Sequence, residues 1–473
     1  MNAAARNPRT PPALRLDSQG RRHVDMRAVL ALAAPLVLNS TVQAVLGLTD
    51  TWFVSRLSVT ATAAMAAVYW LVVLALLFFG GATMAVQTLV SQAYGGGRYQ
   101  RASQAMWMGV WASMATTPLF LGLVYLGPGL FSPFGLQPAI EQLAVEYWGP
   151  RMLGGPMGAA IWAITAYFNG IGRTRIPLAI TLVVALANVG LNQLFIFEFG
   201  WGIAGAAWAT TAAQGFALVL AAAVMLRLDA ARMRPLLTWR PRLGAIWRQF
   251  RLGVPMAATA SVDLLAAALF QLMQVRIGAV DGAATQIVMV FTSIAYMPGL
   301  GLALAGTTLV GQSIGAGDRD WAATLGKRVI LLTSSCMGGL GILMALAGRL
   351  LVPLFVNGSD PHADDTIALA TQLLWIAAVY QFTDGLNFSS SFCLRGAGDV
   401  RVPAVLVFVL GFGLFLPLSY LLTFAPDQGW LGGPGVGWGA TGGWTALAVY
   451  SAAAGLALTL RWRQGAWRRI RLG

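Results

Sequence analysis

The chain has 473 residues, of which 57% are hydrophobic and only 10% are charged. Soluble domains carry roughly 25% charged residues, so the composition excludes an ordinary soluble domain and indicates a polytopic helical membrane protein. A net charge of +14 would suggest a nucleic-acid partner for a soluble protein. The positions of the basic residues, described below, exclude that partner.

Apolar stretches fill the chain after a polar N-terminal arm. Residues 1–27 contain Pro, Arg and Gly without an apolar core, so we expect a disordered cytoplasmic arm rather than a cleavable signal peptide. The later stretches are long enough for spanning helices of about 20 residues and lack the alternation of barrel strands. We expect spans at 28–55, 60–91, 105–127, 139–171, 177–198, 202–226, 252–277, 283–313, 329–356, 365–394, 402–424 and 436–460. The sequence therefore predicts an all-α protein with twelve transmembrane helices in a lipid bilayer.

The basic residues predict the orientation of these spans. When the connections are assigned alternately to two sides, twenty-seven of the 31 Lys and Arg residues fall on one side. The exceptions are Arg56, Arg151, Arg276 and Arg349. Cytoplasmic loops are the ones enriched in Lys and Arg. We therefore expect a multi-pass protein of the bacterial inner membrane with both termini and the 227–250 segment in the cytoplasm.

Two sequence blocks occur twice and indicate a duplicated half. Residues 88–97 (TLVSQAYGGG) return as 308–317 (TLVGQSIGAG), and residues 168–177 (FNGIGRTRIP) return as 394–403 (LRGAGDVRVP). Each half holds six spans, an even number, so the halves enter the membrane in the same orientation and form a parallel repeat. The expected divisions are an N-lobe at 28–226, a cytoplasmic linker at 227–250, a C-lobe at 251–460 and a basic cytoplasmic tail at 461–473.

The first lobe places polar residues inside its spans. A carboxylate at mid-membrane costs roughly 2.5–3.5 kcal/mol on insertion scales, so Asp50 indicates a functional site. Asn188 and Asn192 lie one helical turn apart and join it as a candidate substrate or proton site, although asparagines also serve as packing contacts between membrane helices. Arg151 also lies inside a span. An ion pair of Arg151 with Glu146 or Glu198 is one alternative, and the sequence assigns no role to this arginine.

The second lobe carries two acids in different spans, Asp263 and Asp384, and Tyr380 precedes Asp384 by one turn. Two carboxylates and an aromatic oxygen suit a hard cation or a proton. The alternative is an acid at a helix end or one buried against a hydrogen-bond partner. The two cysteines and two histidines lack metal-ligand spacing, so we expect no disulfide and no cofactor, with a sodium ion at Asp263 and Asp384 as the metal hypothesis.

Four stretches resemble the multidrug and toxic compound extrusion (MATE) transporters, and within them the NorM-like branch. They are 34–57 (APLVLNSTVQAVLGLTDTWFVSRL), 89–97 (LVSQAYGGG), 251–263 (RLGVPMAATASVD) and 380–399 (YQFTDGLNFSSSFCLRGAGD). The resemblance implies two six-helix lobes, alternating access, and export of small organic cations in exchange for sodium ions or protons by a monomer that is not an enzyme.

The resemblance also implies residue roles. Asp263, Tyr380 and Asp384 match the positions that place the coupling cation, and Asp50, Asn188 and Asn192 match the first-lobe positions. Asp263 is one methylene shorter than the family's usual Glu, which puts the coordination distance and the choice of ion in doubt.

Two other functions are weighed against this interpretation. A lipid-linked oligosaccharide flippase of the same superfamily should line its cavity with basic residues for phosphate, and only Arg151 and Arg276 are available within the spans. A membrane-embedded enzyme needs a constellation of His, Cys or Ser that no span provides.

Overall fold

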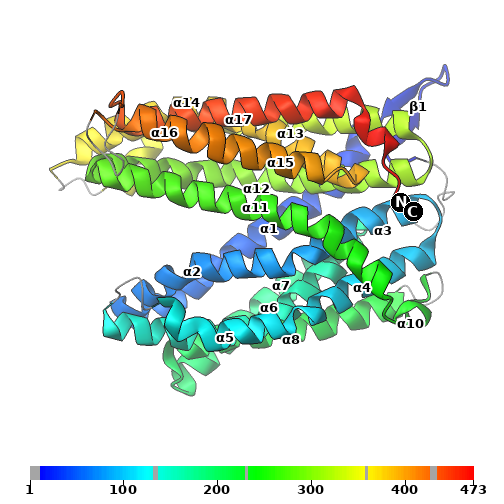
Figure 1. The fold of residues 1–473 in the computed structure, drawn as a ribbon, viewed down its shortest axis with the longest axis horizontal. Helices are drawn as coiled ribbons and strands as arrows, with labels where there is room; N and C mark the ends of the chain where they lie inside the picture. Colours follow the sequence, from blue (N-terminus) through cyan, green and yellow to red (C-terminus); the bar gives the residue numbers. More distant parts are fainter. Residues whose placement is uncertain (1–10, 132–136, 229–232, 357–360, 427–433, 473) are drawn as a thin grey trace. The chain divides into compact units, whose positions relative to one another are not determined.

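The computed structural model describes residues 11–131, 137–228, 233–356, 361–426 and 434–472. The expectations for residues 1–10, for 229–232 of the linker and for Gly473 lie outside them. The chain divides into two compact units (Figure 1). Unit 1 comprises Met1–Leu14, Asp25–Ala258 and Gly311–Asp318, and unit 2 comprises Arg15–Val24, Thr259–Val310 and Arg319–Gly473.

Unit 1 is built from helices that begin at recognisable caps. The Asp25 carboxylate accepts the backbone N–H of Ala28 at the start of α1, and the Ser58 hydroxyl accepts that of Ala61 at the start of α2. Its elements are α1 (Met26–Ser55), α2 (Val59–Gly80), η2 (Gly81–Met84), α3 (Ala85–Gly95), α4 (Tyr99–Ala115), α5 (Thr117–Phe131), α6 (Pro138–Gly170), α7 (Arg175–Asn192), the π-helical turn η4 (Gln193–Glu198), α8 (Gly202–Leu228) and α10 (Pro235–Thr238).

Unit 2 contains longer helices, and α14 packs against both α13 and α17. Its elements are β1 (Leu14–Leu16), β2 (Arg22–Val24), α11 (Leu243–Ile277), α12 (Ala279–Gly315), α13 (Arg319–Leu351), η5 (Val352–Phe355), α14 (Ala363–Ala397), α15 (Arg401–Leu410), η6 (Gly411–Phe415), α16 (Leu416–Thr423), α17 (Gly439–Gln464) and η7 (Ala466–Arg469). Leu14 of β1, the first part of α11 and the last residues of α12 belong to unit 1.

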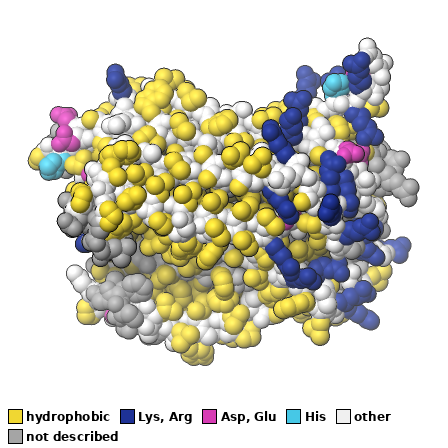
Figure 2. Space-filling view, turned by 45° about the horizontal axis from the view of Figure 1, so that its top comes forward, with side chains coloured by type: hydrophobic (Ala, Val, Ile, Leu, Met, Phe, Trp, Pro, Cys, Tyr) yellow, Lys and Arg dark blue, Asp and Glu magenta, His cyan; other side chains and the backbone are white. Residues whose placement is uncertain are grey.

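The expected spans are confirmed as helices. Eleven helices in the described part of the chain are long and apolar enough to cross a membrane. The fourth expected span, 139–171, forms α6, a helix of 33 residues that is not among the eleven. It contains two acids, an arginine, two internal prolines and several glycines. On the face shown in Figure 2, Lys and Arg side chains gather toward one end, away from most of the hydrophobic side chains.

The sequence repeat is also a repeat of backbone conformation. Gly172 and Gly398 both have left-handed φ angles, +81° and +86°, and each ends a long helix. The N–H groups of the following residues, Arg173 and Asp399, donate to carbonyls five residues back at 2.9 Å in both copies. Gly97 and Gly317 repeat the feature, with φ of +68° and +88°. Glycine is required at these turns because an L side chain rarely adopts such angles.

Two expected boundaries differ from the structure. The arm that we expected to be disordered contains the β1–β2 hairpin, and the Asp17 carboxylate closes its turn by accepting the N–H groups of Gln19 and Arg21, both at 2.8 Å. That local hydrogen bonding holds the polar segment in shape, so the expectation of disorder is wrong for residues 14–24. The described linker is likewise partly helical, because α11 already begins at Leu243.

The linker is attached to unit 1 rather than free. The indoles of Trp107 and Trp111 on α4 donate to the carbonyls of Pro235 and Trp239 at 3.0 and 2.6 Å. The hydroxyls of Ser103 and Thr238 lie 2.9 Å apart. These contacts explain why unit 1 continues through the described linker into α11.

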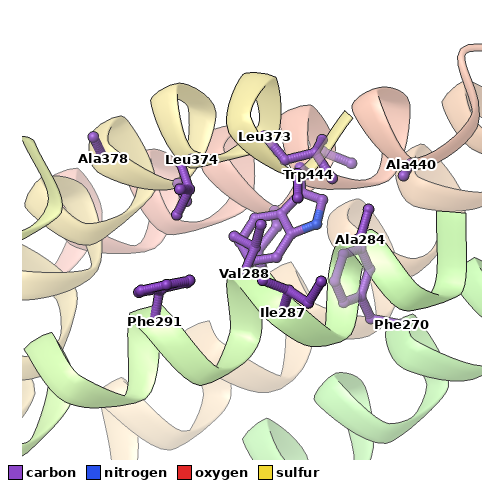
Figure 3. Packing of buried hydrophobic residues seen from close by; sticks show 14 of the residues in the cluster. Phe270, Ala284, Ile287, Val288, Phe291, Leu373, Leu374, Ala378, Ala440 and Trp444 are labelled. Carbon is purple, nitrogen blue, oxygen red and sulfur yellow. The ribbon is translucent and has the colours of Figure 1, made fainter. Parts of the chain in front are cut away.

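Each unit has its own hydrophobic core, and that of unit 2 surrounds Trp444 on α17 (Figure 3). The indole packs edge-on against Phe270, with ring centroids 5.7 Å apart, and against Tyr380 at 6.2 Å. Its Nε1–H donates to the Thr285 hydroxyl at 3.3 Å. Because Tyr380 belongs to this packed core, its ring on α14 has a fixed place next to Asp384.

Candidate functional site

The three residues that the sequence proposed for the first lobe lie together in unit 1. Asp50 on α1 accepts the side-chain amide of Asn192 on α7 at 2.7 Å, and the same amide donates to Asn188 at 3.0 Å. The Thr210 hydroxyl on α8 donates to the other carboxylate oxygen of Asp50 at 3.3 Å. Both asparagines are fully buried. Neutral donors from two other helices therefore hold the Asp50 carboxylate.

Arg151 lies in the same region of unit 1, on α6. It is close enough to Asp50 and Tyr147 to interact with them electrostatically. Among the described residues it forms no ion pair within 4 Å, so the suggested pairing with Glu146 or Glu198 is not found. Its Nε and Nη1 atoms are buried and have no hydrogen-bond partner in the described chain.

The second-lobe acids also lie together, in unit 2. Asp263 on α11 and Asp384 on α14 are near enough to repel one another electrostatically. The Asn387 amide donates to Asp384 at 3.3 Å, and Tyr380 interacts electrostatically with the same carboxylate. Asp263 is exposed and Asp384 is half-buried. Neither carboxylate forms an ion pair within 4 Å in the described part of the chain.

Two tyrosines of this cluster were missed by the sequence reasoning. The buried Tyr450 on α17 donates its hydroxyl to Asp263 at 3.4 Å. Tyr296 on α12 interacts electrostatically with both carboxylates. Each lies in an apolar helix without an acid of its own near it in sequence, so no local pattern identified it. With Tyr380, these residues surround two acids with three aromatic hydroxyls.

A cavity of about 680 Å³ lies beside the unit 1 cluster. It is lined by Met157, Phe195, Ala204, Thr211, Ala212, Gly215 and the two tryptophans Trp201 and Trp208. Thr210 and Thr211 are consecutive on α8, and consecutive helical residues point about 100° apart. Asp50 contacts the first of them and the cavity is lined by the second. The apolar cavity is therefore a neighbour of the polar cluster and does not contain it.

Comparison with known proteins agrees with this architecture. The MatE family model matches residues 35–194 and 255–421. The chain is 28% identical over 445 residues to a probable multidrug resistance protein NorM of Agrobacterium fabrum, covering 92% of this chain and 93% of the relative. A protein of the same name from Brucella suis is 29% identical over 476 residues, covering 96% of both chains.

Solved structures show the same fold at lower sequence identity. An outward-facing multidrug resistance MATE family transporter superposes with a TM-score of 0.81 at 17% identity, covering 93% of this chain and 96% of the other. The eukaryotic MATE transporter AtDTX14 superposes with a TM-score of 0.79, also at 17% identity, covering 94% and 96%. The family match extends over both units and includes Asp50, Asn188, Asn192, Asp263, Tyr380 and Asp384. The chain therefore belongs to the MatE family, whose members are membrane transporters and not enzymes.

Proposed function

We propose that the protein is a secondary active antiporter that exports amphipathic, mostly cationic organic compounds in exchange for sodium ions or protons. The observation that carries this proposal is that each unit holds its own acid cluster and that the two clusters differ in chemistry. Asp50 has amide and hydroxyl donors around it, whereas Asp263 and Asp384 have each other and tyrosines, with Arg395 interacting electrostatically with Asp263. The names of the relatives, probable multidrug resistance proteins, support the same function.

The unit 1 cluster suits the organic substrate. The donors that contact Asp50 are neutral, so they orient the carboxylate without forming an ion pair with it, and Arg151 acts on its charge only from beyond 4 Å. The Asp50 carboxylate is partly buried, and in a medium of lower dielectric than water it attracts an organic cation more strongly than it would in water. The half-exposed Tyr69 and the buried Tyr147 supply aromatic faces in the same unit.

The unit 2 cluster suits the coupling ion. Two carboxylates that face one another repel, so the pair either shares a proton or holds a metal cation. Carboxylate and hydroxyl oxygens are hard ligands of the kind that a sodium ion accepts. Either form connects Asp263 and Asp384 to an ion gradient, and hydrogen bonds from Tyr450 and Asn387 orient the two carboxylates.

The energy of the exchange limits the mechanism. One charge that moves down a potential of about 100 mV releases about 2.3 kcal/mol, which concentrates a neutral solute roughly fifty-fold if coupling is tight. Export of a monovalent cation against the same potential consumes that electrical energy. The chemical gradient of the ion, or a second ion, must then drive export.

The proposal is tested with purified protein in proteoliposomes that contain a fluorescent organic cation. Sodium and proton gradients are imposed separately at zero membrane potential. We expect one of the two ion gradients to drive the dye across the vesicle membrane against the concentration gradient of the dye. Dye movement that ignores both gradients would reject antiport by either ion.

The orientation in the membrane is part of the proposal. We propose a location in the bacterial inner membrane with both termini in the cytoplasm, and the support for it is that most Lys and Arg residues fall on one side of the predicted spans. Leu237 is exposed at the end of α10, so Leu237→Cys offers a labelling site. A membrane-impermeant thiol reagent should label it only in inverted vesicles, and labelling in intact cells would reverse the orientation.

A further inference from the structure

The unit 1 cluster contains more hydrogen-bonding capacity than its own residues use. Nε and Nη1 of Arg151 and Nδ2 of Asn188 are buried donors without a partner among the described residues. Oδ1 of Asn192 and Oε1 of Gln214 are buried acceptors that also lack a hydrogen-bond partner among the described residues. An unsatisfied buried polar group costs roughly 1–3 kcal/mol, and more when it is charged. Such a concentration in one region indicates a binding site for a polar ligand.

Arg151 is the charged member of this set, and its position on α6 is well supported. Tyr147, one turn earlier, is 5% exposed. One turn later, the side chains of Thr211 and Gln214 from α8 lie against Gly154, so that a Cβ there would meet them at 2.7 and 2.8 Å. The glycine lets α8 approach α6 closely. The guanidinium therefore lies on a packed helix pair and not on a mobile loop.

Asp50 does not use the donors of Arg151. The two side chains interact electrostatically but are more than 4 Å apart, and both oxygens of Asp50 already accept hydrogen bonds from Asn192 and Thr210. Unit 1 thus offers a negative and a positive group from two different helices. The arginine keeps free N–H groups, and an arginine fork matches the two oxygens of a carboxylate.

A purely cationic ligand uses only half of this arrangement. Asp50 attracts it, but Arg151 repels it at short range in a medium of low dielectric. A ligand that carries both an ammonium and a carboxylate meets the opposite charge at each end and satisfies the unpaired guanidinium. The geometry therefore suits organic zwitterions in addition to the organic cations of the proposed function.

We infer that Arg151 is a specificity-determining residue that binds the carboxylate of amphipathic zwitterionic substrates, while Asp50 binds their cationic nitrogen. This inference rests on the proposed export function and specifies a class of its substrates. The competing role for Arg151 is that of a counter-ion that only tunes the charge of Asp50. A counter-ion would affect cationic and zwitterionic substrates alike.

The test uses two dyes that share one ring system. Rhodamine 19 carries a free carboxylate and is zwitterionic at neutral pH, whereas rhodamine 6G is its ethyl ester and is a cation. Gradient-driven efflux of each dye is measured in proteoliposomes for the parent, Arg151→Gln and Arg151→Lys. Arg349→Gln, at an exposed arginine in the last turn of α13, is the matched control for loss of a positive charge.

We expect Arg151→Gln to lower rhodamine 19 efflux roughly tenfold or more, because a charge-assisted hydrogen bond is lost. Rhodamine 6G efflux should persist or rise, because Arg151→Gln removes the repulsion of a cation, and its persistence also shows that the variant is folded. Arg151→Lys should recover part of the rhodamine 19 efflux, since it keeps the charge but not the planar fork. Arg349→Gln should change neither dye.

Two results would overturn the inference while leaving the export function intact. One is an equal change in the efflux of both dyes in Arg151→Gln, and the other is a parent protein that exports rhodamine 6G but not rhodamine 19. Equilibrium binding of both dyes to the purified protein is measured in parallel. If neither dye is driven by a gradient, the proposed antiport fails. The binding ratio of the two dyes in parent and Arg151→Gln then still decides the role of Arg151, because loss of rhodamine 19 affinity alone supports it and equal losses reject it.

Discussion

The two units share a backbone plan and differ in where their charges lie. The glycine turns at Gly172 and Gly398 have nearly the same φ angle and the same hydrogen bonds. The acid of unit 1 is held by neutral amide and hydroxyl donors, whereas unit 2 opposes two acids and surrounds them with tyrosines. Duplication therefore preserved the helix ends that set the fold, while the polar interiors diverged. In the function that we propose, this divergence separates substrate binding from ion coupling.

The largest effect is expected at the acids of unit 2. Asp384→Asn and Asp263→Asn each remove one charge of the facing pair and keep its size. Gradient-driven efflux of rhodamine 6G should fall more than about tenfold, because the pair no longer holds a cation or exchanges a proton. Equilibrium binding of the dye should persist, since its proposed site is in unit 1. Transport under an imposed gradient and binding to purified protein measure the two properties.

Asp320→Asn is the control for these variants. Asp320 is an exposed acid of the same unit that pairs with Arg468 at 2.7 Å. Its variant should transport like the parent. Efflux that persists in both Asp384→Asn and Asp263→Asn with unchanged ion dependence would place ion coupling elsewhere, and Asp50 would become the leading candidate.

At Asp50 of unit 1 we expect the opposite of the result at the unit 2 acids: dye binding should weaken and ion dependence should stay unchanged. Asp50→Asn keeps hydrogen-bonding atoms for Asn192 and Thr210, so insertion and expression should stay near the parental level. The loss of charge should weaken binding of a cationic dye by several-fold, and efflux should fall with it. The ion concentration for half-maximal transport should not change. A variant with parental dye affinity would show that Asp50 is structural.

Much of this comparison was accessible from the sequence, because it depends on local patterns. The repeated blocks predicted the turns at Gly172 and Gly398, since a glycine that ends a helix takes a left-handed conformation. The rarity of acids in apolar helices identified Asp50, Asp263 and Asp384. The structure then brought the acids into two clusters, as expected.

Three features could not be predicted from the sequence. Two depend on residues far apart in the chain, and one depends on a single side chain. Tyr450 contacts an acid 187 residues earlier in the chain, and an isolated tyrosine in an apolar helix is equally common as packing. The unpartnered donors of Arg151 depend on the absence of any nearby acid at contact distance, which no sequence pattern reports. The hairpin at residues 14–24 was hidden by a composition typical of disorder, although a single carboxylate, Asp17, closes its turn.

An intermediate effect is expected at Tyr450. Tyr450→Phe removes the hydroxyl that donates to Asp263 but keeps the ring, which packs 5.3 Å from that of Phe415. A buried hydrogen bond from a neutral donor to a carboxylate contributes about 1.5–3 kcal/mol. Because Asp263 is exposed, we expect a smaller contribution here. We expect the ion concentration for half-maximal transport to change about three- to tenfold, with dye affinity unchanged.

The control for Tyr450→Phe is Tyr125→Phe in unit 1, where the tyrosine is 83% exposed. The ion dependence of transport, measured at a fixed gradient of the dye, should respond only to the first variant. A change in dye affinity instead of ion dependence would assign Tyr450 to substrate binding. The two units would then not divide the functions as proposed.

The smallest effect concerns one position at which the repeated turns differ in charge. Asp399 follows Gly398 in unit 2, and Arg173 holds the corresponding place in unit 1. The Asp399 side chain is 4% exposed and accepts a hydrogen bond from Arg461 at 2.9 Å, which connects the turn after α14 to the end of α17. Arg461→Gln leaves a buried carboxylate without its cation. We expect a loss of about 1–3 kcal/mol in the free energy of unfolding.

That loss should appear as a fall of a few degrees in the unfolding temperature of the purified protein, with efflux activity retained below it. The matched control is Arg463→Gln, an exposed arginine on the same helix end, which should leave the unfolding temperature unchanged. Asp399→Asn should cost less than Arg461→Gln, because it removes the buried charge together with its need for a partner. Equal unfolding temperatures for all three variants would show that the Asp399–Arg461 pair does not stabilise the turn.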